Sequence, residues 1–307
     1  MSTLIYKIKN KLFRLTKEAA KVKRPSYEEL VKYKTCNYSN DSKFILSFGA
    51  GRCGQNWFAK IFNSHYNWIG TSERFSNEEA FYRFISYYNL PIEKEAIYQL
   101  FELARNRDLS KYNNSFIASP YLSFGVQDLC ERLQPNYLFF NLRDPVKSVE
   151  SFHRKGWYSK LNNFQIKKSP IIDISINLKR SFSRVIPKND YLNEWLKLTN
   201  IGKIAWYWAT VNKAIFDDFK KLNNIEKHYF KLEDIDQNYN FYLNLVNKFN
   251  LKNQLKEKDF YNIINKTPNR GPKNKYKFNE WNKLEKLEFE NIINKIFPDF
   301  HSIKTTI

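Results

Sequence analysis

Three glycines, Gly49, Gly51 and Gly54, lie between a short apolar run at residues 44–48 and an amphipathic run at residues 55–62. A strand, a glycine-rich loop and a helix in that order present backbone N–H groups and a helix N-terminus to a phosphate. The interval from Gly49 to Gly54 is that of the G-x-x-x-x-G loop of nucleotide triphosphatases. These spacings predict a phosphate-binding loop at residues 49–54.

The two positions after Gly54 differ from that loop. A nucleotide triphosphatase has Lys and then Ser or Thr there, to hold the phosphates and Mg²⁺, whereas this chain has Gln55 and Asn56. The phosphate cradle is kept without the metal-ligating hydroxyl. The three cysteines and four histidines show no metal-ligand spacing either, so no metal site is predicted.

A second charged position follows the apolar run at residues 137–142, where Arg143 stands at the end of an expected strand. Ligands of open α/β sheets bind beyond the carboxyl ends of the strands, and a guanidinium there can hold a phosphate through two hydrogen bonds. Ser151 follows eight positions later, so its hydroxyl could hold the same phosphate. The simpler interpretation is an ordinary strand-end charge pair between Arg143 and Asp144.

The order of elements favours an α/β fold with a central, mostly parallel sheet flanked by helices in three layers. Strands are expected at 44–48, 67–75 (with a loop), 115–118, 137–142 and 228–232. Helices are expected at 55–62, 77–90, 91–105, 122–133, 145–156, 201–222, 238–250, 254–265 and 281–296.

We divide the chain into two parts. Residues 1–40 form a basic N-terminal helix, ending before Pro25, and a polar linker, and residues 41–307 form the main domain. The helix could lie on an anionic membrane surface or pack on the domain. Residues 157–200 are irregular, and a segment of that length inside an α/β domain is typical of a functional insertion, here a candidate acceptor-binding region.

Composition and charge say more about the cellular compartment of the protein than about its binding partner. The net charge of +20 favours anionic partners, but the charge is spread along the chain and no nucleic-acid recognition module is present. An odd number of cysteines and the absence of a secretory leader or a long apolar run favour a cytoplasmic protein that could be peripheral to a membrane.

Three stretches together resemble a known family, the sulfotransferases that use 3′-phosphoadenosine 5′-phosphosulfate (PAPS). Residues 49–57, GAGRCGQNW, resemble the family's 5′-phosphosulfate loop, and residues 142–151 resemble its 3′-phosphate motif. Residues 267–281 resemble its C-terminal basic loop and Trp-bearing helix. The resemblance spans residues 44–296 and implies a P-loop-type sulfotransferase fold with PAPS as sulfuryl donor and no metal.

The resemblance also implies roles for individual residues. Arg52 would touch the transferred sulfuryl group, and the neighbouring loop positions would surround the 5′-phosphate: Cys53, Gly54, Gln55, Asn56 and Trp57. Arg143, Ser151 and Arg270 would hold the 3′-phosphate, with Lys273 nearby, and Gly271 would also belong to the cofactor-binding residues. This chain departs from the family at Cys53, at Gln55 and Asn56, and at Leu232, where the family has a Tyr near the adenine.

Sulfuryl transfer needs a fixed cation for the leaving oxygen and a base for the acceptor hydroxyl. Arg52 fits the first role. Glu73 resembles the catalytic Glu of the tyrosylprotein and some carbohydrate sulfotransferases, although it could instead be a loop residue paired with Arg74. His153 is the alternative base, and Cys53 is a candidate nucleophile because a helix N-terminus lowers thiol pKa values.

The sequence therefore predicts a PAPS-dependent sulfotransferase acting on a hydroxyl acceptor. A glycan acceptor is favoured, with peptide or lipid as alternatives, since basic and aromatic segments suit sugar rings. The rival hypotheses are an inactive sulfotransferase-like nucleotide-binding protein, suggested by Gln55 and Asn56, and a P-loop kinase. The kinase requires the Lys and hydroxyl that this loop lacks.

Overall fold

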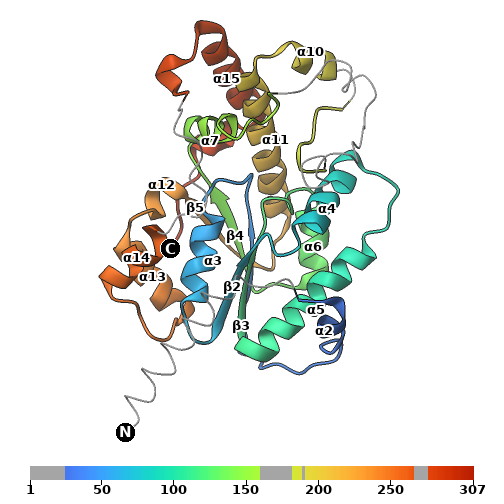
Figure 1. Cartoon of the computed structure of the whole chain (residues 1–307), viewed down its shortest axis with the longest axis vertical. Coiled ribbons are helices and arrows are strands. Elements are labelled where there is room, and N and C mark those ends of the chain that lie inside the picture. The colour runs from blue at the N-terminus through green and yellow to red at the C-terminus, as the bar shows by residue number, and fades with distance from the viewer. Residues whose placement is uncertain (1–24, 160–181, 189–190, 266–275) are drawn as a thin grey trace.

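A five-stranded parallel sheet forms the centre of the molecule in a computed structural model that describes residues 25–159, 182–188, 191–265 and 276–307. Its strands are β1 (Phe44–Phe48), β2 (Trp68–Ser72), β3 (Asn114–Ala118), β4 (Tyr137–Leu142) and β5 (Glu226–Lys231). Their spatial order is β2-β3-β1-β4-β5, and every neighbouring pair is parallel (Figure 1). The predicted α/β class is confirmed.

The central strands are apolar on both faces because helices cover both faces of the sheet. In β1, Phe44, Leu46 and Phe48 belong to one hydrophobic core and Ile45 to the other. Alternation of this kind follows from the two-residue period of a strand. One core lies between each face of the sheet and the helices that cover it, so the fold has three layers. The strands are parallel, and their carboxyl ends therefore lie at one common edge.

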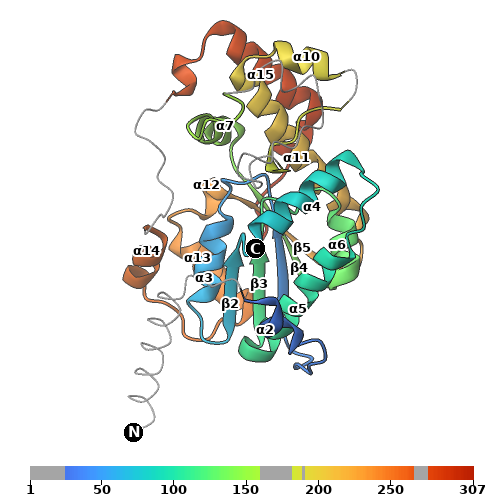
Figure 2. The ribbon, with the colours of Figure 1, turned by 45° about the vertical axis from the view of Figure 1, so that its right-hand side comes forward.

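The helices divide between the two faces and the carboxyl edge of the sheet (Figures 1 and 2). The smaller core is covered by α3 (Gln55–Asn63), α13 (Tyr239–Phe249) and α14 (Glu257–Asn265). The larger core is covered by α4 (Ser76–Tyr88), α5 (Glu95–Tyr112), α6 (Val126–Leu133) and the long α11 (Asn200–Lys221). Beyond the carboxyl edge lie α7 (Pro145–His153), α10 (Tyr191–Lys197) and α15 (Lys283–Ile296), with two short 3₁₀ turns at Phe278–Glu280 and Pro298–His301.

Several helix limits differ from the predicted ones. Helix α5 starts at Glu95, later than the predicted Pro91, and continues to Tyr112. Its last turns are held against the core, where Asp108 and Leu109 are buried. Helix α6 starts at Val126 and not at Leu122, because Gly125 takes a left-handed conformation at its N-cap. The predicted irregular segment 157–200 contains α10. The predicted strand at 228–232 ends one residue early, and α12 (Leu232–Ile235) follows it.

The segment after Pro25 is attached to the domain. It contains a short helix, α2 (Tyr27–Val31), where a polar linker was expected. Leu30 is fully buried, and Glu29 forms an ion pair of 2.7 Å with Arg107 of α5. The predicted basic helix at 1–24 lies outside the described residues. Within the part of the chain that the structure describes, no helix is both long and apolar enough to cross a membrane.

Helix α3, which follows the glycine loop, packs directly on strand β2 at Gly70. A Cβ atom at Gly70 would lie 2.0 Å from the backbone oxygen of Ala59. We expect Gly70→Ala to lower the free energy of unfolding by about 3 kcal/mol, because the helix must move away from the sheet. Gly156→Ala is the control: it adds strain at a positive φ in a loop but meets only the Ser159 side chain, so about 1 kcal/mol is expected. Urea unfolding of both variants measures the difference, and equal losses would contradict close α3–β2 packing.

Candidate functional site

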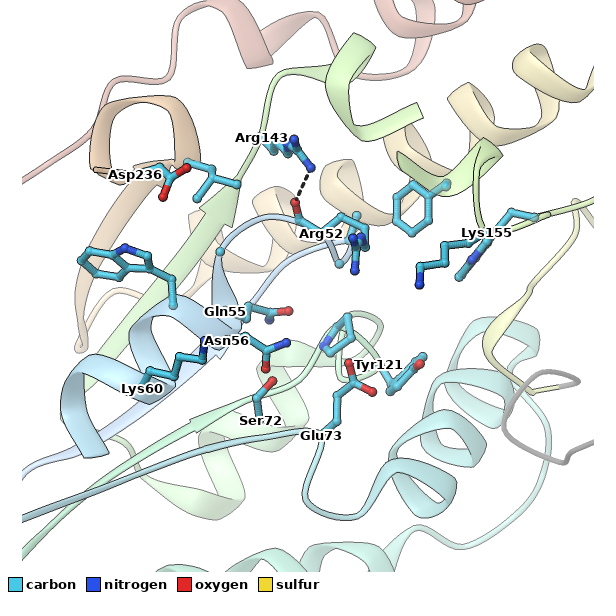
Figure 3. A pocket seen from close by; sticks show the side chains of 18 of the residues that line it. Arg52, Gln55, Asn56, Lys60, Ser72, Glu73, Tyr121, Arg143, Lys155 and Asp236 are labelled. Atoms are coloured by element: carbon cyan, nitrogen blue, oxygen red, sulfur yellow. Dashed lines mark hydrogen bonds between the residues drawn. The ribbon is translucent and has the colours of Figure 1, made fainter. Parts of the chain in front are cut away.

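A cavity of about 590 Å³ opens at the carboxyl edge of the sheet. Segments that follow all five strands contribute to its wall, as the position of ligand sites in open α/β sheets requires (Figure 3). The wall includes seven residues singled out from the sequence: Arg52, Gly54, Gln55, Asn56, Trp57, Glu73 and Arg143. Cys53 and Ser151 do not line it. Arg270, Gly271 and Lys273 lie outside the described residues.

The glycine loop turns sharply between β1 and α3. Gly51, Arg52 and Gly54 all have positive φ angles, of 94°, 61° and 93°. Gly54 is the N-cap of α3, and a side chain at that φ would be strained. The positive end of the α3 dipole thus begins at the cavity wall, where it favours an anionic ligand.

Arg52 is held in place from two sides. Its Nε donates to Ser151 Oγ at 2.9 Å, and its carbonyl oxygen accepts from Arg143 Nη1 at 3.2 Å. Burial lowers the pKa of Arg52, and the positive charges of Arg143 and Arg154 lower it further. A guanidinium nevertheless remains protonated at neutral pH, so Arg52 presents a fixed positive charge to the cavity. Ser151, which is fully buried, orients this charge.

Arg143 lies just beyond the carboxyl end of β4, beside the glycine loop that carries Arg52 (Figure 3). Its Nε lies 3.9 Å from Glu233 Oε1, which is too long for a hydrogen bond. The same carboxylate accepts from the Asp144 backbone N at 3.1 Å. Asp144 itself caps α7 and accepts from the Lys147 backbone N, so the simple charge pair between Arg143 and Asp144 is not what the structure shows. Arg143 also lines the cavity, where a guanidinium can bind an anion.

Glu73 follows β2 and also takes a positive φ, of 53°. A non-glycine residue in this region is strained by about 1–2 kcal/mol, and such strain is concentrated at functional sites. Its backbone N donates to Ala118 O at 3.0 Å. The suggested Glu73–Arg74 pair is wrong: Arg74 turns into the core and forms an ion pair of 2.7 Å with the buried Asp108. That pair fixes the chain beside Glu73.

The two alternative reactive groups are placed less favourably. Burial raises the pKa of Cys53 to about 11, so its thiol stays protonated at neutral pH, contrary to the nucleophile hypothesis. His153 packs beside the Tyr276 ring, with ring centroids 5.1 Å apart, and is absent from the cavity wall. Burial lowers the pKa of His153, which leaves it neutral but out of reach of a cavity ligand.

Gln55 and Trp57 connect the loop to the smaller core. The Gln55 side chain is buried, and its Nε2 donates to the Ser47 carbonyl at 3.2 Å. Trp57 is 7% exposed and packs against Phe241 and Phe260, yet it also lines the cavity with Leu232. The cavity therefore has an apolar slot beyond the loop, lined by Trp57 of α3, Leu232 of α12 and Ile264 of α14.

The remaining wall residues were not found from the sequence, and they include Lys60, Ser72, Pro120, Tyr121, Lys155, Trp157, Tyr207 and Asp236. Tyr121 could have been found, because it follows a predicted strand just as Arg143 and Glu73 do. Tyr207 lies within the long helix α11, where its spacing predicts only burial. Its hydroxyl donates to Ala50 O at 3.3 Å and is contacted by the buried Arg83, so α11 supports the glycine loop from behind.

Metal ligands are not gathered at this site. Among the residues that the structure describes, no group of three or more His, Cys, Asp or Glu side chains could hold an ion. The wall instead carries four cationic and two carboxylate side chains: Arg52, Lys60, Arg143, Lys155, Glu73 and Asp236. This arrangement can bind an anion and can accept a proton at Glu73.

Comparison with known proteins gives only distant similarity, among solved structures. No family model matches the chain, and no curated protein matches it. Among solved structures, the chain is similar to a "Sulfotransferase Domain from the Curacin Biosynthetic Pathway", with 14% sequence identity and a TM-score of 0.39 over 70% of this chain and 76% of that chain. A similarity of this degree does not transfer a function to the present protein.

Proposed function

We propose that the protein transfers a sulfuryl group from PAPS to a hydroxyl acceptor, with a carbohydrate favoured. The observation that carries this proposal is the placement of Arg52 and Glu73 on the wall of one cavity. A fixed cation in a phosphate-binding loop and a carboxylate across the same cavity are the two groups that the reaction needs.

In the proposed reaction the acceptor oxygen attacks sulfur in line. The S–O bond to the leaving nucleotide breaks, its electrons pass to the phosphate oxygen, and the acceptor proton passes to Glu73. Arg52 stabilises the charge on the leaving oxygen, in the way that preorganised donors stabilise an oxyanion. Ser151 keeps Arg52 in its orientation through the 2.9 Å hydrogen bond to Nε.

The nucleotide would occupy the side of the cavity lined by α3 and α12. The α3 N-terminus and the Asn56 amide would receive the 5′-phosphate, and Arg143 would contact the 3′-phosphate. The adenine would enter the apolar slot lined by Trp57, Leu232 and Ile264. Leu232, where the family has a Tyr, thus offers an apolar contact in place of an aromatic one.

One observation favours the alternative of an inactive nucleotide-binding protein. The Gln55 amide donates its hydrogen bond to the Ser47 carbonyl and so supports the loop. Fewer side-chain N–H groups are then left to bind the phosphates of PAPS. The two hypotheses share the nucleotide site and differ in turnover. The kinase hypothesis has no comparable support, because Arg143 stands where that chemistry needs a metal-binding acid.

Binding of 3′-phosphoadenosine 5′-phosphate, compared with ATP and Mg²⁺, tests the proposal by isothermal titration. Tighter binding of the 3′-phosphorylated nucleotide is expected, and a preference for ATP and Mg²⁺ would reject it. Transfer of labelled sulfate to an acceptor panel then separates an enzyme from an inactive binding protein.

Arg143→Ala is expected to weaken binding of 3′-phosphoadenosine 5′-phosphate by about 10–100-fold, because a hydrogen bond to a charged group contributes about 1.5–3 kcal/mol. Lys147→Ala is the matched control. Lys147 lies 3.8 Å from the same Glu233 carboxylate but is not on the cavity wall, so its loss should leave the affinity unchanged. An unchanged affinity in the Arg143 variant would remove the 3′-phosphate assignment.

A further inference from the structure

The four cations of the cavity wall are divided between its two ends. Lys60 lies at one end with Asp236, Arg52 and Arg143 lie near the middle, and Lys155 lies at the other end with Tyr121 (Figure 3). Under the proposed function, the nucleotide occupies the end of Lys60 and the middle. Lys155 is therefore the cation of the acceptor end.

The backbone around Lys155 is fixed. The Lys155 N–H donates to Phe152 O at 3.0 Å, the next residue, Gly156, turns the chain at a φ of 67°, and Trp157 N donates to the same Phe152 oxygen at 3.3 Å. The Trp157 ring packs on Phe152 and on Tyr207, with ring centroids 4.7 Å apart in both pairs. Lys155 is thus held on a rigid turn, and its side chain reaches the cavity from there.

The Lys155 ammonium differs from the other wall cations in its contacts. Arg52 is bound to Ser151, and Arg143 to the loop carbonyl of Arg52. No hydrogen bond or ion pair joins the Lys155 ammonium to any other residue that the structure describes. It is exposed to the cavity and can accept a counter-ion from a ligand.

The charges near Lys155 add to its positive field. Arg154 lies close enough to Arg52 to influence it electrostatically, and the Arg184 guanidinium lies 5.2 Å from the centre of the Trp157 ring. Glu73 is the one carboxylate that lines this end among the described residues, and it serves as the proposed base. A partly enclosed cavity screens charges less than bulk water does, so an anionic acceptor is favoured over a neutral one.

From these placements we infer that the acceptor is a carbohydrate that carries a carboxylate, bound by Lys155, beside the hydroxyl that receives the sulfuryl group. Tyr121 and Trp157 place aromatic side chains on the wall at this end of the cavity, and aromatic side chains are suited to contact with a sugar. The inference rests on the proposed sulfuryl transfer. It extends that proposal from a hydroxyl acceptor in general to an acidic sugar.

The test uses the full chain saturated with 3′-phosphoadenosine 5′-phosphate and two matched probes, 4-nitrophenyl β-D-glucuronide and 4-nitrophenyl β-D-glucoside. The probes differ only in a carboxylate or a hydroxymethyl group. Equilibrium dialysis is expected to show at least about 10-fold tighter binding of the glucuronide, the effect of one hydrogen bond to a charged group. Lys155→Met should reduce the preference to about twofold or less, and Lys155→Arg should retain most of it.

Lys221→Met removes the same charge far from the cavity, from an exposed lysine paired with Asp218 on α11, and should keep the full preference. Equal binding of the two probes, no binding of the glucuronide, or a preference that survives in Lys155→Met would each overturn the inference. Nucleotide binding is measured first in every sample. Failure at that step would reject the proposed function itself, so the two failures are distinguishable.

Discussion

Arg52→Ala should lower the rate of sulfuryl transfer by about 10³-fold, because removal of one preorganised donor from a charge-stabilising site has an effect of about 10²–10³ and Arg52 also carries a full charge. The loss should appear in kcat more than in nucleotide affinity. Its charge matters most when the bond to the leaving phosphate breaks, whereas α3 and Arg143 bind the nucleotide before and after that step. Single-turnover transfer of labelled sulfate measures the chemical step directly.

Two further variants separate the charge of Arg52 from its orientation. Arg52→Lys keeps a charge without the Nε that donates to Ser151, and Ser151→Ala keeps the guanidinium without its anchor. Both should lie between wild type and Arg52→Ala. If Arg52→Ala transferred sulfate at the wild-type rate while binding the nucleotide weakly, Arg52 would be a binding residue only, and the proposed mechanism would lose its charge-stabilising group.

The glycine loop and its two flanking strands could be predicted closely because their signals are local. Strands β1 and β4 coincide with the predicted residues 44–48 and 137–142, since short, nearly continuous apolar runs bounded by polar or glycine residues are typical of buried strands. Helix α3 starts directly after Gly54 as expected. Because the strands are parallel, Arg52, Glu73 and Arg143 could also be placed at one edge of the sheet.

The orientation of individual side chains could not be predicted in this way. The interval from Arg143 to Ser151 places Ser151 on a helix after the strand, but it does not say which face of that helix is buried. Helix α7 buries Ser148, Ser151 and Phe152, so Ser151 reaches the cavity only through Arg52. Cys53 is likewise turned inward by the positive φ angles on both sides of it.

Long-range contacts account for the other differences. Tyr207 reaches the glycine loop from α11, 157 residues away along the chain, and no local pattern encodes such a contact. Lys155 could not be found from the sequence, because a lysine near the end of a predicted helix is ordinarily a solvated residue. Its role depends on the turn at Gly156 and on the rings of Trp157 and Tyr207, which come together only in the folded chain.

Glu73→Gln should lower kcat by about 10²–10⁴-fold, the usual contribution of a positioned general base. The amide has nearly the same shape as the carboxylate, so the strained backbone at φ 53° and the hydrogen bond from Glu73 N to Ala118 O are kept. Binding of 3′-phosphoadenosine 5′-phosphate should therefore remain unchanged. Steady-state transfer rates and nucleotide titrations on the same preparation measure the two quantities.

Glu93→Gln, at an exposed position before α5, removes the same charge away from the cavity and should have wild-type kcat. His153→Gln addresses the alternative base. His153 lies outside the cavity wall, so its loss should leave most of the activity. The opposite result, an inactive His153 variant beside an active Glu73 variant, would require the contact between the His153 and Tyr276 rings to open when the acceptor binds. In that case Glu73 would not be the base. Its strained backbone and the neighbouring ion pair between Arg74 and Asp108 would then serve no step of the reaction.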